Sequence, residues 1–227
     1  MRISYAILIF NDVNVKCSDI PKIRGYLSNR LREHKELHNH LDEGGFDYRF
    51  PSIQYRIINN KPAIIAIQRG YDAIKNIFFS IDELRMGVKR ITINEKIIEV
   101  RESDFGDTKE YYDYKFISPW MALNEKNHIE YTNRNPIEKQ KLLKKILRGN
   151  LLTISKGFNY TIKDIDNIHV EGYFIPRHIN FKMQKMLCFN GSFTVNFKIP
   201  DYIGVGKQSA RGFGVIRKII SGGKHDQ

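Results

Sequence analysis

The sequence predicts an α+β fold made of two consecutive units, each with the order strand, helix, two strands, helix, strand. Three observations predict it. Short runs rich in β-branched and aromatic residues recur along the chain, apolar residues at helical spacing follow a strand-like run in each half, and Gly106-Asp107 separates the halves. This order is that of the ferredoxin-like (RRM-like) fold. We therefore expect two tandem ferredoxin-like domains, residues 1–106 and 107–227, of which the second is degenerate.

The first half contains every element of such a unit. Ile20, Ile23, Leu27 and Leu31 recur at helical spacing directly after the first strand-like run. Asn59-Asn60-Lys61-Pro62 is a turn signal between two further runs. The sequence predicts strands at 2–10, 48–58 and 63–68, a strand or hairpin at 89–101, helices at 20–31 and 71–79, and a loop at 35–46.

The second half is less regular. Residues 136–152 are a strong helix signal, with Pro136 at the start and Ile137, Leu142, Leu143, Ile146 and Leu147 on one side. Asn190-Gly191 predicts a hairpin turn between strands at 186–189 and 192–199. Further strands are predicted at 111–121, 174–179 and 212–220, and no clear signal marks a second helix.

The charge of the chain indicates an anionic partner. Lys and Arg number 37 against 25 Asp and Glu, which gives a net charge of +12. Nucleic acid is the first candidate and a membrane surface the second. The basic helix at 136–152 is better explained as a core-facing helix with a solvated lysine face than as a membrane anchor. No run approaches transmembrane length, and the two distant cysteines indicate a reducing compartment, so we expect a cytoplasmic protein that binds no membrane.

A glycine-rich segment, residues 204–214, is the first candidate binding site. Two Gly-apolar-Gly triplets bracket Lys207, Gln208, Ser209, Ala210 and Arg211. Glycines permit close approach and positive φ, successive N–H groups can bind an anion, and the two cations favour phosphate. The spacing fits neither a Walker A loop nor a dinucleotide fingerprint, and a simple tight turn is the alternative. The predicted RNA-binding residues are Gly204, Gly206, Lys207, Gln208, Ser209, Arg211, Gly212 and Gly214, with Arg24 and Arg30 as further phosphate contacts.

Together with the stretches FDYRFPSIQYRIINNKPAIIAI (46–67) and ISPWMALN (117–124), this segment resembles the RAMP superfamily of CRISPR RNA-binding proteins. Within it the chain resembles an archaeal-type "b"-like subgroup of the repeat-processing endoribonucleases, the sixth CRISPR-associated family. The resemblance implies two ferredoxin-like domains and cleavage of CRISPR repeat RNA without a metal or other cofactor. It also implies that precursor transcripts are cut into guide RNAs.

A histidine cluster is the candidate catalytic site. Metal-free RNA cleavage needs a base for the 2′-OH and an acid for the departing 5′-oxygen, and imidazole, with a pKa of about 6.5, can serve as either. The resemblance implies that His40, His38 and Tyr48 are the catalytic residues; which histidine is the base stays open. His34, His38, His40 and Asp42 could instead bind zinc, or the cluster could be structural. The letters HNH at 38–40 lack the ββα-metal context of HNH nucleases.

The function predicted from the sequence is therefore an endoribonuclease that leaves a 2′,3′-cyclic phosphate and a 5′-OH. The alternative is a non-catalytic RAMP subunit that binds RNA within a CRISPR effector complex. Repeat RNA is the expected partner in both cases, subunits of an effector complex are further candidate partners, and the protein is expected to be a monomer or homodimer.

Overall fold

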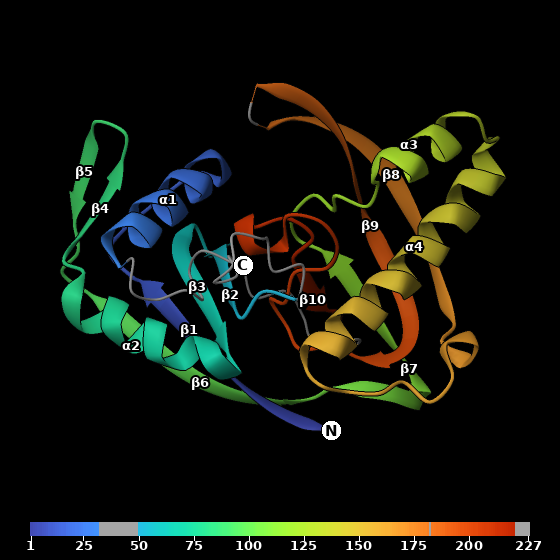
Figure 1. Ribbon diagram of the computed structural model, residues 1–227, viewed down its shortest axis with the longest axis horizontal. Coiled ribbons are helices and arrows are strands. Elements are labelled where there is room, and N and C mark those ends of the chain that lie inside the picture. Colours follow the sequence, from blue (N-terminus) through green and yellow to red (C-terminus); the bar gives the residue numbers. More distant parts are fainter. Residues whose placement is uncertain (32–49, 182, 221–227) are drawn as a thin grey trace, which may run out of the picture. The chain divides into compact units, whose positions relative to one another are not determined.

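The computed structural model describes residues 1–31, 50–181 and 183–220 of the 227-residue chain. These residues form two compact units, each with its own four-stranded sheet (Figure 1). The N-terminal unit consists of Arg2–Ser103 together with Ser209–Gly212. The C-terminal unit consists of Met1, Asp104–Gln208 and residues 213–220. The middle of the glycine-rich segment thus belongs to the N-terminal unit.

The N-terminal unit has the predicted ferredoxin-like topology. Its main elements are β1 (Arg2–Phe10), α1 (Ile20–Arg30), β2 (Ile53–Ile58), β3 (Lys61–Ile67), α2 (Tyr71–Ser80) and β6 (Lys96–Asp104). The strands are ordered β2-β3-β1-β6, and β3 pairs antiparallel with both β1 and β2. A small hairpin, β4 (Glu83–Met86) with β5 (Lys89–Thr92), lies between α2 and β6. The region 89–101, predicted as a strand or hairpin, is therefore divided between β5 and β6.

The apolar spacing of α1 has the predicted consequence. Ile20, Ile23 and Leu27 are all buried and pack in one cluster with Leu8 of β1 and Ile74 of α2. Burial of such side chains is the main stabilising term for a helix in a domain of this size. The helix therefore forms because its buried face covers the sheet.

The turn between β2 and β3 is shorter than predicted. Asn59 and Asn60 alone form it, with φ of 49° and 63°, and Ile58 pairs directly with Lys61. Two consecutive positive-φ residues are the signature of a type I′ hairpin turn. Lys61 and Pro62 lie in β3, so their assignment to the turn was wrong.

The C-terminal unit is a degenerate copy of the same topology. Its elements are β7 (Gly106–Phe116), α3 (Glu125–Thr132), α4 (Pro136–Gly157), β8 (Val170–Phe181), β9 (Gln184–Lys198) and β10 (Ile216–Lys218). Their order in the sheet is β10-β7-β9-β8, the same spatial order as in the N-terminal sheet when strands are counted along the chain. In the described residues no α-helix connects β9 to β10, and the glycine-rich segment with the short 3₁₀ helix η5 (Ser209–Arg211) stands in that place. The predicted fold, including the degenerate second unit, is confirmed.

The hairpin predicted at Asn190-Gly191 was wrong. β9 runs through both residues, and its pairing with β8 is unbroken from Val170↔Val195 to Phe181↔Gln184. A Cβ at Gly191, where φ is +147°, would lie 2.2 Å from the carbonyl oxygen of Tyr173. This glycine therefore allows close approach of the neighbouring strand, a role that the same dipeptide can signal as well as a turn.

The long helix α4 begins at Pro136 as predicted and continues to Gly157, beyond the predicted end at residue 152. Asn135 and Glu138 form a capping box at its start. Ile137 was predicted on the buried side but is 71% exposed, because the first turn precedes the stripe that is buried from Leu142 on. α3, which precedes it, was not predicted.

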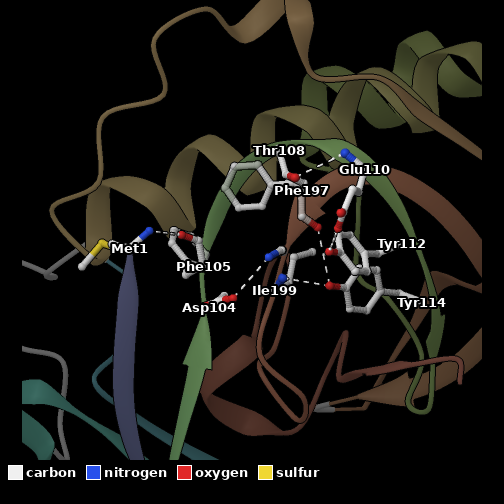
Figure 2. A network of polar contacts seen from close by, with 10 residues as sticks. Met1, Asp104, Phe105, Thr108, Glu110, Tyr112, Tyr114, Phe197 and Ile199 are labelled. Carbon is white, nitrogen blue, oxygen red and sulfur yellow. Dashed lines mark hydrogen bonds and ion pairs between the residues drawn. The ribbon is translucent and has the colours of Figure 1, made fainter.

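β7 begins earlier than predicted and carries a bulge between Asp107 and Tyr112. Figure 2 shows the polar contacts around it, in which the Tyr114 hydroxyl accepts a hydrogen bond from Ile199 N at 2.9 Å. Burial raises the pKa of Tyr114 to about 12, so the phenol stays protonated. β7 also ends earlier than predicted, at Phe116 instead of residue 121, and β10 is shorter than predicted, with three residues instead of 212–220. Beyond β7, Trp120 and Met121 form only isolated bridges.

Candidate functional site

The two ends of the glycine-rich segment are tied to each other. Gly204 forms a bridge with Val215, and Val205 N donates to the carbonyl oxygen of Gly214 at 2.8 Å. Gly214 has φ of +61°, and a Cβ there would lie 1.9 Å from the Val205 carbonyl oxygen. The pairing therefore requires glycine at residue 214, and it closes the segment into a loop.

A buried tryptophan, Trp120, contacts the glycine-rich loop on the side that faces the core. Trp120 is fully buried, and its Nε1 donates to Oδ1 of Asn150 on α4 at 3.1 Å. Gly206, with φ of +87°, lies so close that a Cβ would approach Trp120 Nε1 to 2.6 Å. The tryptophan thus supports the loop from within the core and offers no exposed ring for stacking on a base.

The middle of the segment is held by a buried arginine. Arg56 on β2 has no exposed surface, and its guanidinium donates to the carbonyl oxygen of Ser209 at 2.8 Å and to that of Tyr55 at 3.4 Å. It also donates to the side chain of Gln54. Burial lowers the pKa of Arg56 to about 9, which leaves it charged at neutral pH. A buried cation is stable only when such acceptors surround it, so this one fixes the η5 turn against β2.

Sequence reasoning missed Arg56. A signal existed, because Gln54 and Arg56 are polar residues at alternate positions of the otherwise apolar strand IQYRII. Two polar side chains on one face of a buried strand indicate a buried polar contact. The partner, 153 residues further along the chain, could not be read from that pattern.

Two other arginines lie close together beside this turn. Arg211 is half-buried, and burial first, then the positive charge of Arg24 on α1, lower its pKa. Two neighbouring guanidiniums repel each other, and a bound anion would relieve that repulsion. Arg24 and Arg211, distant in sequence and both predicted phosphate contacts, are thus brought together within the N-terminal unit. We call them the Arg24–Arg211 pair.

The other predicted RNA contacts are placed differently. Lys207 is exposed, Gln208 has an unusual positive φ of 58°, and the Ser209 side chain is buried. Gly212, with φ of +85°, lies over the Tyr55 carbonyl. Arg30 is exposed at the end of α1 and lines a separate groove with Tyr26, Ser80, Asp82, Glu83 and Arg85, which contains acidic residues.

The predicted catalytic residues His38, His40 and Tyr48 lie outside the described residues, as do His34 and Asp42 of the zinc alternative. Within the ranges that the structure describes, His, Cys, Asp and Glu side chains do not gather into groups of three that could hold a metal ion. None of the helices in those ranges has the length and apolar character needed to cross a membrane.

Known proteins match both units. The Cas6b N-terminal domain family matches residues 1–104, and the Cas6b C-terminal domain family matches residues 106–219. The chain belongs to the Cas6b family. The resemblance inferred from the glycine-rich segment and its two accompanying stretches is therefore confirmed.

Solved Cas6b structures share the fold over nearly the whole chain. A crystal structure of Cas6b has a TM-score of 0.90 and 34% identity, and the match covers 96% of this chain and 100% of that chain. A crystal structure of the CRISPR RNA processing endoribonuclease Cas6b has a TM-score of 0.78 and 30% identity over the same shares. The uncharacterized protein MJ0978 of Methanocaldococcus jannaschii is 37% identical over 145 residues, 63% of this chain and 97% of that protein.

Within this Cas6b fold, the residues described above carry positive charge in each of the two units. In the C-terminal unit Lys207 is exposed, but the backbone N–H groups of Val205, Lys207 and Gly214 all donate to carbonyl oxygens of the chain itself. In the N-terminal unit the Arg24–Arg211 pair contributes charge. Cationic side chains of this kind suit a phosphodiester and supply no proton acceptor near neutral pH. Acid–base chemistry would have to come from other residues.

Proposed function

We propose that the chain is a metal-independent endoribonuclease that binds CRISPR repeat RNA and cuts precursor transcripts into guide RNAs. The observation that carries this proposal is the Cas6b match over both units, which includes 30% identity to a CRISPR RNA processing endoribonuclease. The net charge of +12 and the cationic glycine-rich loop suit an RNA ligand.

In the proposed mechanism the 2′-OH beside the scissile bond attacks the phosphorus. One of His38 and His40 removes the 2′-OH proton, the other protonates the departing 5′-oxygen, and Tyr48 hydrogen-bonds the phosphate or orients a histidine. The products are a 2′,3′-cyclic phosphate and a 5′-OH. The glycine-rich segment and the Arg24–Arg211 pair would hold the RNA, so residues 1–106 would cut and residues 107–227 would contribute most of the binding loop.

The test is cleavage of a repeat RNA by the full chain in EDTA, beside the same RNA with one 2′-deoxy nucleotide at the cut site. Cleavage of the first and not of the second is expected. His40→Ala should lose most activity, because an acid or base contributes about 10²- to 10⁴-fold, while RNA affinity stays unchanged. His128→Ala, on α3, is the matched control with full activity expected.

Three outcomes would overturn the mechanism. Cutting of the 2′-deoxy RNA would exclude attack by the 2′-OH, and loss of activity in EDTA with recovery on added zinc would favour the histidine-bound metal. Tight binding of repeat RNA without any cleavage would favour a non-catalytic RAMP subunit.

The proposal also includes binding to effector subunits, a monomeric or homodimeric state and a cytoplasmic location. The free thiols of Cys17 and Cys188 suit that reducing compartment.

A further inference from the structure

A basic groove runs beside α4 in the C-terminal unit. One wall consists of four cations of the helix, Lys141, Lys144, Lys145 and Arg148, and the other of residues 168–171, which lead into β8. The groove has a volume of about 220 Å³. That is below the roughly 300–1,000 Å³ typical of pockets that enclose a small molecule. A groove of this size suits a polymer backbone that passes through it.

The four cations share one face of the helix. Their spacing of three, four and seven residues places them in one row that extends for about 10 Å along the axis. Asn150, which binds Trp120 beneath the glycine-rich loop, lies on the opposite side of the same helix. The groove is therefore a surface separate from the glycine-rich segment, although one helix supports both.

Hydrogen bonds fix the two walls relative to each other. The Gln140 side chain donates to the carbonyl oxygen of Phe174 at 2.9 Å and accepts from its N–H at 3.0 Å. These bonds satisfy the backbone N–H and carbonyl groups of one residue of β8. This strand is at the edge of its sheet and lies alongside α4 (Figure 1). The groove is thus formed before any ligand binds, and a ligand need not order it.

The groove has a surplus of positive charge. Lys144 pairs with Glu171 at 2.7 Å and Arg148 with Asp166 at 3.8 Å, but both carboxylates are largely exposed. Exposed ion pairs contribute little to stability, so a phosphate can replace either carboxylate at small cost. In the described parts of the chain, Lys141 and Lys145 form no ion pair. The two unpaired lysines make the groove attractive to an anion.

We propose that this α4 groove binds the phosphate backbone of RNA that flanks the repeat segment held by the glycine-rich loop. The identity of the ligand as RNA rests on the proposed function; the polyanion-binding chemistry rests on the groove. The protein then has two separate RNA anchors, and the second acts only on transcripts that extend past the first.

Salt-dependent binding of two RNAs tests the groove. One RNA is the repeat alone and the other carries ten added nucleotides at each end; the proteins are the wild type and Lys141→Ala/Lys145→Ala. On the longer RNA the double variant should bind roughly tenfold more weakly near 0.1 M salt. The slope of log Kd against log salt should fall by about 1.4, since each contact to a single strand contributes about 0.7. On the repeat alone the two proteins should bind alike.

Matched variants separate the groove from overall charge. Lys126→Ala/Lys156→Ala removes two exposed lysines from the same unit outside the groove and should keep the wild-type slope. Lys141→Arg/Lys145→Arg should also keep it, because the charge remains. An unchanged slope in the Ala groove variant, or an equal loss on both RNAs, would overturn the proposal.

The outcome is independent of catalysis. A wild type that binds both RNAs but cuts neither refutes the endoribonuclease and leaves the groove result interpretable. A groove variant that cuts the repeat normally and binds the long RNA like the wild type refutes only the groove. Binding of an acidic probe, a carrier protein with a polyglutamate tag, is measured as well. If the Ala groove variant binds both RNAs like the wild type but binds this carrier less well, the groove is a protein-docking surface and the proposal is wrong.

Discussion

The two units have the same strand order but fill one connection differently. In the N-terminal unit α2 links the third strand to the fourth, and its Ile74 and Ile77 are buried against the sheet. In the C-terminal unit the glycine-rich segment occupies that connection. It contains positive-φ residues at Gly206, Gln208, Gly212 and Gly214, which an α-helix excludes. The difference shows how an apolar packing element can be replaced by a loop that is held by backbone hydrogen bonds and positive-φ residues.

The replacement changes what holds the connection in place. α2 is held by non-directional burial of apolar side chains, which tolerates conservative substitution. The glycine-rich segment depends on close backbone contacts, on Trp120 and on one buried arginine. Single substitutions should therefore be more damaging in the segment than in the helix.

The largest effect is expected at Gly214. Gly214→Ala places a methyl group on the Val205 carbonyl oxygen and forces a positive φ on alanine. We expect a loss of about 3 kcal/mol in the free energy of unfolding, in the range of strained backbone positions. Urea denaturation measures it. Ala73→Gly in α2 is the counterpart in the helix and should cost about 2 kcal/mol, from the low helix propensity of glycine and the loss of one buried methyl group; a loss equal to or larger than that of Gly214→Ala would contradict the comparison.

Arg56 is next. Arg56→Met keeps an unbranched side chain but leaves the carbonyl oxygen of Ser209 without its donor, which should cost about 2 kcal/mol of stability. It should also weaken RNA binding, because the η5 turn loses its anchor. Denaturation and RNA titration measure the two effects. Arg85→Met, an exposed arginine of the same unit, should change stability by less than about 0.5 kcal/mol. Wild-type stability in Arg56→Met would show that the turn needs no anchor.

The outcomes for α1, α4 and the segment show what the sequence can predict. Apolar spacing located both helices, because a helix that covers a sheet repeats its buried residues locally. Asn190-Gly191 led to a wrong hairpin prediction, because the same dipeptide can occur at a turn or within a strand. In the strand, the glycine leaves room for the backbone of the neighbouring strand. For the site, composition located the glycine-rich segment, but Arg56 depends on a partner 153 residues away. His38, His40 and Tyr48 stay predictions.

The Arg24–Arg211 pair tests whether the place of a charge matters for binding. Arg211→Ala removes one charge of the pair, so RNA affinity should fall about tenfold, or about 1.4 kcal/mol. Arg30→Ala removes the same charge from the groove that contains Asp82 and Glu83 and should weaken binding much less. Titration of repeat RNA with both variants makes the comparison, and equal losses would show that only total charge matters.

The smallest effect compares the two units at matched helical glycines. Gly25 on α1 and Gly149 on α4 have no atoms within 4 Å of an added Cβ, and neither has a positive φ. Alanine at either position should therefore stabilise its helix by roughly 0.5–1 kcal/mol, because glycine loses more backbone entropy on folding. If both gains appear in one common unfolding transition, the units unfold together. If each variant moves a different transition, the segment shared between the units does not couple their stabilities, and the damage from Gly214→Ala should be confined to the C-terminal transition.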